Sequence, residues 1–342
     1  MVLQVKANIF EKHPKKTGFI LFLLILLALY GAASIKFINN KYTEFENKSI
    51  KKIVHQYYVG QIIDNNIGRF IKLREHRPDE EKFERPTRNY VNNLEPNALE
   101  RKYYRVVTDK HGFIGPSEIH ENPDYKIVFL GGSTTECLYM DEHDRFPYKV
   151  GRLLEQSLGK KVNSYNGGVS ANESLHSINI LLNKVIPMQP QVVVFMHNIN
   201  DLVILRSQGS YWYPNSLKSH VQSAKNIFTR YEFPENSPGF DEQKISEEFA
   251  RNLRTFIAIC KIRNITPVLM TQANRVKDDP LYHRFNDIIR EVGLKESVKV
   301  IDLANNIEGN SENFYDSYHY TAKGADFAAK IIAKELQPLL KQ

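Results

Sequence analysis

From about residue 124 onward, short β-prone runs alternate with longer amphipathic stretches. The runs predict strands at 126–130, 161–165, 191–196, 266–271 and 298–303. The amphipathic stretches predict helices at 147–158, 173–185, 242–263, 280–292 and 321–340. Apolar strands that are separated by helices are typical of a parallel sheet covered on both faces. The pattern predicts an α/β fold of three layers around a five-stranded parallel sheet, spanning residues 124–342.

Two other stretches break this alternation. Residues 206–241 contain Trp212, several aromatic residues and five prolines or glycines, and they predict a long insertion near the edge of the sheet where sites form. Residues 37–123 are polar and carry a densely charged section at 74–89. We expect this part to be a partly helical stalk and lead-in.

The stretch from Thr17 to Ile35 contains no charged residue. A helix of this length spans about 28 Å, close to the hydrocarbon thickness of a bilayer. We therefore expect a transmembrane anchor at 17–36; a cleaved signal peptide, suggested by Ala32–Ser34, and a buried core helix are the alternatives. Lysines in residues 1–16 favour a cytoplasmic N-terminus, although lysines also follow the segment. The globular domain is then expected outside the cytoplasm, in the periplasm or at the cell surface.

The formal net charge of +7 is concentrated around this segment. Residues 1–52 hold nine lysines and three acids, which leaves the rest of the chain nearly neutral. A nucleic-acid-binding domain is therefore not expected. The eleven histidines show no metal-ligand spacing, and the two cysteines, Cys137 and Cys260, predict separate buried thiols rather than a disulfide or zinc site.

A serine follows the first predicted strand and two glycines, in the sequence Gly131-Gly132-Ser133. A serine in this place could belong to a phosphate-binding loop, support nucleophilic chemistry or stand in an ordinary turn. The sequence lacks the lysine of a P-loop and does not fit Gly-x-Gly-x-x-Gly, which disfavours a phosphate- or nucleotide-binding protein. A nucleophile also needs a base and donors for an oxyanion.

His319 is a candidate base, and Asp316 is a candidate acid that orients it. They follow the last predicted strand, and their spacing of three residues can bring the side chains together. A surface histidine beside a helix-capping aspartate is the alternative. Asp302 is a rival acid, but it lies seventeen residues before His319.

Candidate oxyanion donors follow two other strands. Asn200, in the sequence 197–202, offers a side-chain NH₂ group, and the glycine turn at 165–174 offers backbone N–H groups. Each feature alone is common in turns. Their joint occurrence at strand ends points to acyl-transfer chemistry.

The order of these motifs resembles that of the SGNH hydrolases, also called the GDSL esterase/lipase family, over about 124–340. Residues 108–116 resemble the stretch that often precedes the first strand in bacterial members. The chain has Gly132 where the family has Asp in Gly-Asp-Ser, and Asn198 where it has Gly in Gly-x-Asn-Asp. The resemblance implies a flavodoxin-like fold, the catalytic residues Ser133, Asp316 and His319, and an oxyanion hole of Ser133, Ala171 and Asn200. The family glycine of the second motif aligns with Ala171, with Gly168 as the neighbouring candidate.

The resemblance implies a cofactor-independent serine esterase. For a domain outside the membrane we expect small acyl groups, such as O-acetyl on an envelope carbohydrate, to be removed or transferred to an acceptor. Hydrolysis and O-acetyl transfer both remain open. The alternative from another class is a non-catalytic envelope protein that binds glycan through Tyr211, Trp212 and Tyr213.

Overall fold

The computed structural model describes residue 15 and residues 69–71, 73–212, 221–223, 241–276 and 278–341. The chain divides into two units, Met1–Gly68 and Arg69–Gln342, and all described residues except residue 15 belong to the second. The predicted anchor at 17–36 and the first part of the predicted stalk lie outside the described residues. None of the helices formed by the described residues has the length and apolarity that a bilayer crossing requires.

Five parallel strands form the central sheet, in the order β5-β4-β6-β8-β9. The strands are β4 (Tyr125–Gly131), β5 (Val162–Gly168), β6 (Val192–Met196), β8 (Thr266–Met270) and β9 (Lys299–Ile301). Every predicted strand is confirmed to within two residues at each end, except that β5 continues three residues further. The chain leaves β4 toward β5 and later returns to pair β6 on the other side. This reversal places a switch point, where α/β sheets bind ligands, at the carboxyl ends of β4 and β6.

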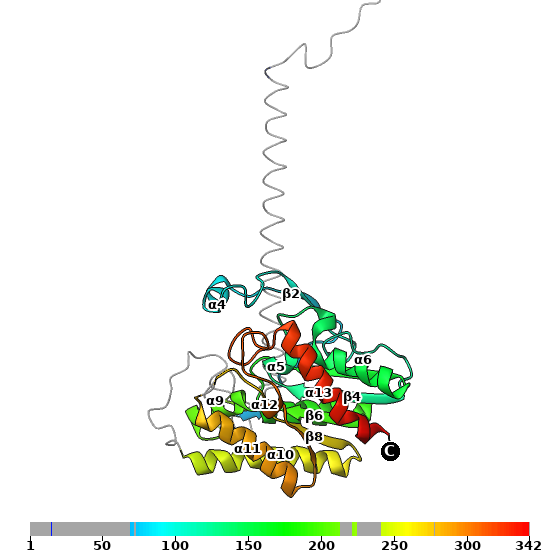
Figure 1. Ribbon diagram of the computed structural model, residues 1–342, viewed down its shortest axis with the longest axis vertical. Coiled ribbons are helices and arrows are strands. Elements are labelled where there is room, and N and C mark those ends of the chain that lie inside the picture. The colour runs from blue at the N-terminus through cyan, green and yellow to red at the C-terminus, as the bar shows by residue number, and fades with distance from the viewer. Residues whose placement is uncertain are drawn as a thin grey trace, which may run out of the picture. The chain divides into compact units, whose positions relative to one another are not determined.

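Alternate residues of the strands enter two separate cores. In β4, Val128 and Leu130 pack with α7 (Ser174–Ile180), α10 (Glu242–Ile262) and α11 (Pro280–Lys295). Ile127 and Phe129 pack on the other face with α6 (Phe146–Leu158) and α13 (Ala322–Leu340). Figure 1 shows these two helical layers on either side of the sheet. The three-layer prediction is therefore confirmed.

The predicted helices are present, with local differences that their sequences explain. Side chains of Asp241, Asp279 and Thr321 accept backbone N–H groups in the first turns of α10, α11 and α13, which fixes where these helices begin. The predicted helix at 173–185 is α7 followed by a π-helical segment, η3 (Leu181–Val185), and the chain continues into α8 (Ile186–Met188).

The insertion predicted at 206–241 starts later in the chain than predicted. Residues 206–208 belong to α9 (Ile199–Gln208), a helix that the sequence pattern does not predict, and Gly209 ends it with a φ of 66°. Further along, the described residues include β7 (Val221–Ser223), which pairs antiparallel with β1 (Arg69–Ile71). Cys137 and Cys260 are buried free thiols, as predicted.

The described part of the predicted stalk is folded against the rest of the unit. It contains β2 (Glu81–Glu84) paired antiparallel with β3 (Tyr104–Val107), and the short helix α4 (Arg88–Asn92) between them. A small core cluster of Leu99, Tyr104 and Tyr315 joins this segment to the loop before α13. We call residues 73–107 the lead-in segment.

Candidate active site

Ser133 is the first residue of α5 (Ser133–Glu136), a short helix that starts directly after β4. The two glycines before it lie close to neighbouring groups and do not have an unusual φ. A Cβ on Gly131 would lie 2.2 Å from Oγ1 of Thr135, and one on Gly132 would lie 2.4 Å from Nδ2 of Asn200. The replacement of Asp by Gly132 therefore leaves room for the Asn200 amide beside the candidate nucleophile.

Ser133, His319 and Asp316 form a continuous hydrogen-bonded relay. Nε2 of His319 lies 2.8 Å from Oγ of Ser133, and Nδ1 of His319 lies 2.6 Å from Oδ2 of Asp316. The ring of His319 stacks on that of Tyr315, with a centroid distance of 5.5 Å and an angle of 9° between the planes. These contacts hold the imidazole with one nitrogen toward the acid and the other toward the serine, which is the arrangement that a general base needs.

Asp316 is surrounded by donors. Its Oδ1 accepts the backbone N–H groups of Tyr318 and His319 at 2.8 and 2.7 Å, and its Oδ2 accepts the hydroxyl of Tyr90 at 2.5 Å as well as the imidazole. Burial alone would raise the pKa of Asp316, but the hydrogen bonds, led by that of His319, lower it to about 2. The carboxylate therefore stays charged at neutral pH and can stabilise an imidazolium.

The rival acid, Asp302, is engaged elsewhere. Its carboxylate accepts Nε and Nη2 of Arg290 at 2.9 and 2.8 Å, and it also caps α12 (Leu303–Asn306). Hydrogen bonds from Arg290 and Thr271 lower the pKa of Asp302 against the opposing effect of burial. The geometry thus favours Asp316 as the partner of His319.

Asn200 lies in the first turn of α9, directly after β6. One N–H of its amide donates to the carbonyl of Asn172 at 2.9 Å, and a primary amide has a second N–H to offer. The neighbouring Asp201 is fully buried and accepts the backbone N–H of Ser174 at 3.0 Å and the hydroxyl of Tyr211 at 2.6 Å. These bonds join α9 to the start of α7, so that Asn200 is presented from a fixed helix end.

This network also corrects the interpretation of Tyr211 as a glycan-contacting residue. Tyr211 is 1% exposed, and its hydroxyl is bonded to Asp201 inside the core. Trp212 is half exposed, whereas Tyr213 lies outside the described residues.

Of the two candidates for the backbone donor, the structure favours Ala171. The N–H of Gly168 is occupied, because it donates to Oδ1 of Asn166 at 3.0 Å. Among the described residues, the N–H of Ala171 has no acceptor. Ala171 has a φ of 62°, which is the left-handed conformation that favours glycine, so alanine keeps the backbone geometry that a glycine would adopt here.

The lead-in segment supports the loop that carries Ala171. The sequence did not indicate this support. Nη2 and Nη1 of Arg74 donate to the carbonyls of Ser170 and Ala171 at 2.8 and 3.3 Å. In return, Nδ2 of Asn172 donates to the carbonyl of Arg74 at 3.0 Å. The left-handed residue is thereby fixed from both sides.

Exchange of Ala171 for glycine is expected to stabilise the fold by about 0.5–1 kcal/mol. Relief of the left-handed strain, about 1–2 kcal/mol, outweighs the entropy that glycine adds to the unfolded chain, about 0.4–1 kcal/mol. Urea unfolding measures the difference, with Ala258→Gly on the exposed face of α10 as the control, where about 1 kcal/mol is lost. A loss of stability in both variants would show that Ala171 carries no such strain.

Exchange of Asn200 for alanine is expected to lower kcat about 10²–10³-fold with a melting temperature close to that of the wild type. In the predicted oxyanion hole this side chain would supply a donor whose bond strengthens only when the oxyanion forms. The matched control is Asn305→Ala, which removes one exposed hydrogen bond to Asp302. Wild-type turnover in the Asn200 variant would exclude an oxyanion role for this residue.

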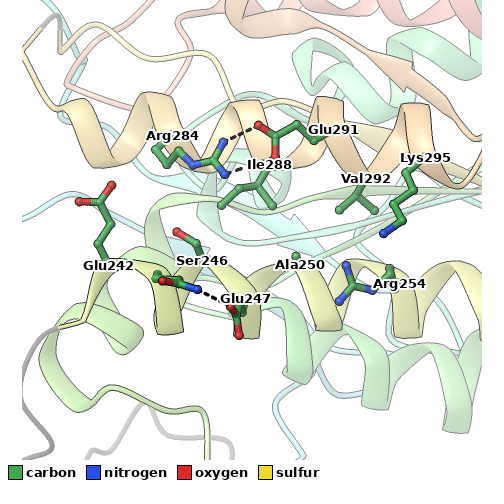
Figure 2. A pocket seen from close by; sticks show the side chains of 11 residues that line it. Glu242, Ser246, Glu247, Ala250, Arg254, Arg284, Ile288, Glu291, Val292 and Lys295 are labelled. Carbon is green, nitrogen blue, oxygen red and sulfur yellow. Dashed lines mark hydrogen bonds and ion pairs between the residues drawn. The ribbon is translucent and has the colours of Figure 1, made fainter.

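Two hollows lined by described residues lie away from Ser133, Asp316 and His319. One of about 640 Å³ runs between α10 and α11, with Ala250, Ile288 and Val292 along its floor and charged side chains at its rim. Figure 2 shows Arg284 and Glu291 paired on one wall of this groove. Another, of about 870 Å³, is lined by residues around the amino ends of β4 and β5. A cavity of only about 10 Å³ adjoins His319.

Comparisons with solved structures find chains of similar fold at low sequence identity. A lipase/acylhydrolase from Enterococcus faecalis is 20% identical, with 63% of this chain and 96% of that chain aligned at a TM-score of 0.44. The enzyme LAE5 from the metagenome of Lake Arreo, Spain, is 15% identical (64% and 97% covered, TM-score 0.46), and the acetylxylan esterase Axe2 from Geobacillus stearothermophilus is 16% identical (62% and 94% covered, TM-score 0.44). No curated protein matches the chain.

The family comparison is more direct. Residues 129–327, more than half of the chain, match the model of the GDSL-like lipase/acylhydrolase family. The match includes Ser133, Ala171, Asn200, Asp316 and His319 and starts after the lead-in segment. The chain therefore belongs to the GDSL-like lipase/acylhydrolase family and is an ester hydrolase.

Proposed function

We propose that Ser133 is the nucleophile of a serine esterase, with His319 as its general base and Asp316 as the acid that orients the base. The observation that carries the proposal is the relay from Asp316 through His319 to Ser133, with its two distances of 2.6 and 2.8 Å. Nε2 of His319 takes the hydroxyl proton as Oγ of Ser133 attacks the ester carbonyl. The same nitrogen then returns the proton to the leaving alkoxide, and an acyl-enzyme remains.

In this proposal the oxyanion is held by the backbone N–H groups of Ser133 and Ala171 and by the amide of Asn200. As the first residue of α5, Ser133 has no acceptor for its N–H within the helix. His319 then takes a proton from a water, which attacks the acyl carbon; the bond from that carbon to Oγ breaks, His319 returns the proton to Oγ, and the carboxylic acid leaves. An acceptor hydroxyl in place of the water would convert hydrolysis into acyl transfer.

For the substrate we propose a small acyl ester, O-acetyl on an envelope carbohydrate. The cavity beside His319, bordered by Thr134, Cys137 and Met140, has a volume of about 10 Å³, which is room for one group of the size of water. Ser133, Ala171 and Asn200 do not line this cavity, so it indicates only that no long acyl chain fits beside the base on that side. The predicted N-terminal anchor supports an envelope substrate.

The test is a series of p-nitrophenyl esters of increasing chain length, together with acetate release from O-acetylated oligosaccharides. The full-length protein is expected to hydrolyse the acetate ester faster than the butyrate ester and the octanoate ester poorly. All of these rates are expected to depend on Ser133. A preference for octanoate would contradict the small-acyl proposal. Acetylated acceptor sugar as the main product would assign the protein to transfer, and glycan binding without Ser133-dependent turnover would favour the non-catalytic alternative.

A further inference from the structure

The hydroxyl of Tyr90, in the lead-in segment, donates to Oδ2 of Asp316 at 2.5 Å. This is the same oxygen that accepts Nδ1 of His319 at 2.6 Å. Tyr90 lies 39 residues before the part of the chain that matches the family, which begins at residue 129. We infer that the lead-in segment completes the active site, with Tyr90 as a positioning residue that acts on His319 through Asp316.

Tyr90 is held in place by its own helix and by a small core. In α4, the hydroxyl of Thr87 accepts the backbone N–H of Tyr90 at 3.1 Å. The ring packs into the cluster formed by Leu99, Tyr104 and Tyr315, and Tyr315 in turn stacks on His319. The phenol therefore reaches Asp316 from a packed position rather than from a free surface side chain.

A second contact joins the lead-in segment to the same loop. Arg275 forms an ion pair with Glu95 of the lead-in segment, and its backbone N–H donates to the carbonyl of Ser317 at 2.8 Å. Ser317 lies between Asp316 and His319. The loop that carries acid and base is thus linked to the lead-in segment directly through Tyr90 and indirectly through Arg275.

The phenol completes the donor set of the carboxylate. A carboxylate has about four acceptor positions, and Asp316 has two backbone donors on Oδ1 and the imidazole and phenol on Oδ2. Burial, followed by the bond to Asp316, raises the pKa of Tyr90, so the phenol remains a donor at all working pH values. With every position filled, rotation of the carboxylate would break at least one bond, and Oδ2 stays aligned with the imidazole.

Tyr90→Phe keeps the ring in the cluster and removes its hydroxyl, which donates to Asp316 and also interacts with the hydroxyl of Tyr315. Since the inference rests on the proposed esterase function, we expect kcat for p-nitrophenyl acetate to fall about tenfold with little change in KM, because a hydrogen bond to a charged group is lost away from the substrate. The matched control is Tyr104→Phe, which removes a hydroxyl of the same cluster that is bonded to the carbonyl of Glu100 at 2.8 Å. The control is expected to keep the wild-type kcat.

A second comparison separates an effect of Tyr90 through Asp316 from a general effect on the fold. In an Asp316→Ala background Tyr90 has no carboxylate to act on, so addition of Tyr90→Phe is expected to leave the remaining kcat unchanged. A tenfold loss that persists in this background, equal losses in the Tyr90 and Tyr104 variants, or a wild-type kcat in Tyr90→Phe would each overturn the inference.

An NMR measurement on the full-length protein in detergent tests the contact without catalysis. With ¹⁵N-labelled histidine, the resonance of the proton between Nδ1 of His319 and Asp316 is expected to shift in Tyr90→Phe and not in Tyr104→Phe. An unchanged resonance would overturn the role of Tyr90. Failure of the esterase proposal appears differently, as wild-type hydrolysis that Ser133→Ala does not reduce.

Discussion

Replacement of Ser133 by alanine is expected to lower kcat for p-nitrophenyl acetate by about 10⁶-fold, to the level that binding and the oxyanion donors alone provide. In the proposed mechanism Oγ of Ser133 is the atom that attacks the ester. The neighbouring hydroxyl of Thr134 cannot replace it, because it is engaged with other protein groups and accepts a hydrogen bond from Nε2 of Gln272 at 2.7 Å. His319→Ala is expected to cost about the same, because an unactivated serine is a weak nucleophile.

The combination of the two changes sharpens this prediction. Residues that act as one unit are not additive, so the double variant Ser133→Ala/His319→Ala is expected to be no slower than either single variant. Ser157→Ala, an exposed serine near the end of α6, is the control and keeps the wild-type rate. If Ser133→Ala retained turnover within tenfold of the wild type, the nucleophile would lie elsewhere.

Replacement of Asp316 by asparagine is expected to lower kcat by about 10⁴-fold while the fold is retained. The wild-type carboxylate accepts Nδ1–H of His319, which leaves Nε2 free to accept the proton of Ser133. An asparagine amide that turns its NH₂ group toward the ring would make Nδ1 the acceptor and move the ring proton to Nε2. That tautomer cannot act as the base toward Ser133.

The measurement is kcat/KM for p-nitrophenyl acetate together with thermal melting. Asp302→Asn serves as the control, since it removes the charge of the rival acid, which is paired with Arg290. The control is expected to lose stability rather than turnover. Comparable losses of turnover in both variants, or a kcat within tenfold of the wild type in Asp316→Asn, would contradict the assignment of the acid.

The sheet and its flanking helices could be predicted because their residues are buried on a regular period. Strands such as β6 are apolar along their whole length, since helices cover both faces. Helix α9 escaped prediction because Leu202, Val203, Ile204 and Leu205 form one contiguous apolar run, which shows no helical period. Its first residues also belong to the sequence Asn198-Ile199-Asn200-Asp201, and asparagine and aspartate are typical of turns.

The parts of the candidate site that lie in short motifs could also be predicted. Asp316 and His319 are three residues apart, and the loop between strand and helix brings them together locally. Tyr90 and Arg74 could not be predicted in this way, because their contacts join residues about 100 to 226 positions apart and depend on how the lead-in segment packs. No local pattern distinguishes the tyrosine of α4 from the many other tyrosines of the chain.

The left-handed φ of Ala171 could be predicted only in part. The family motif indicates glycine at this position, and the sequence alone leaves it open whether alanine preserves the backbone. The two bonds from Arg74 show how the loop tolerates alanine, since they hold the carbonyls of Ser170 and Ala171 in one orientation. The supporting residue again comes from a segment outside the family match.

The most direct test of the central claim, that His319 activates Ser133 as the nucleophile, is covalent labelling by a fluorophosphonate followed by peptide mass spectrometry. We predict one adduct per wild-type chain, on Ser133, and no adduct at the same reagent concentration in His319→Ala. An adduct on another serine, or equal labelling of Ser133 with and without His319, would contradict the account.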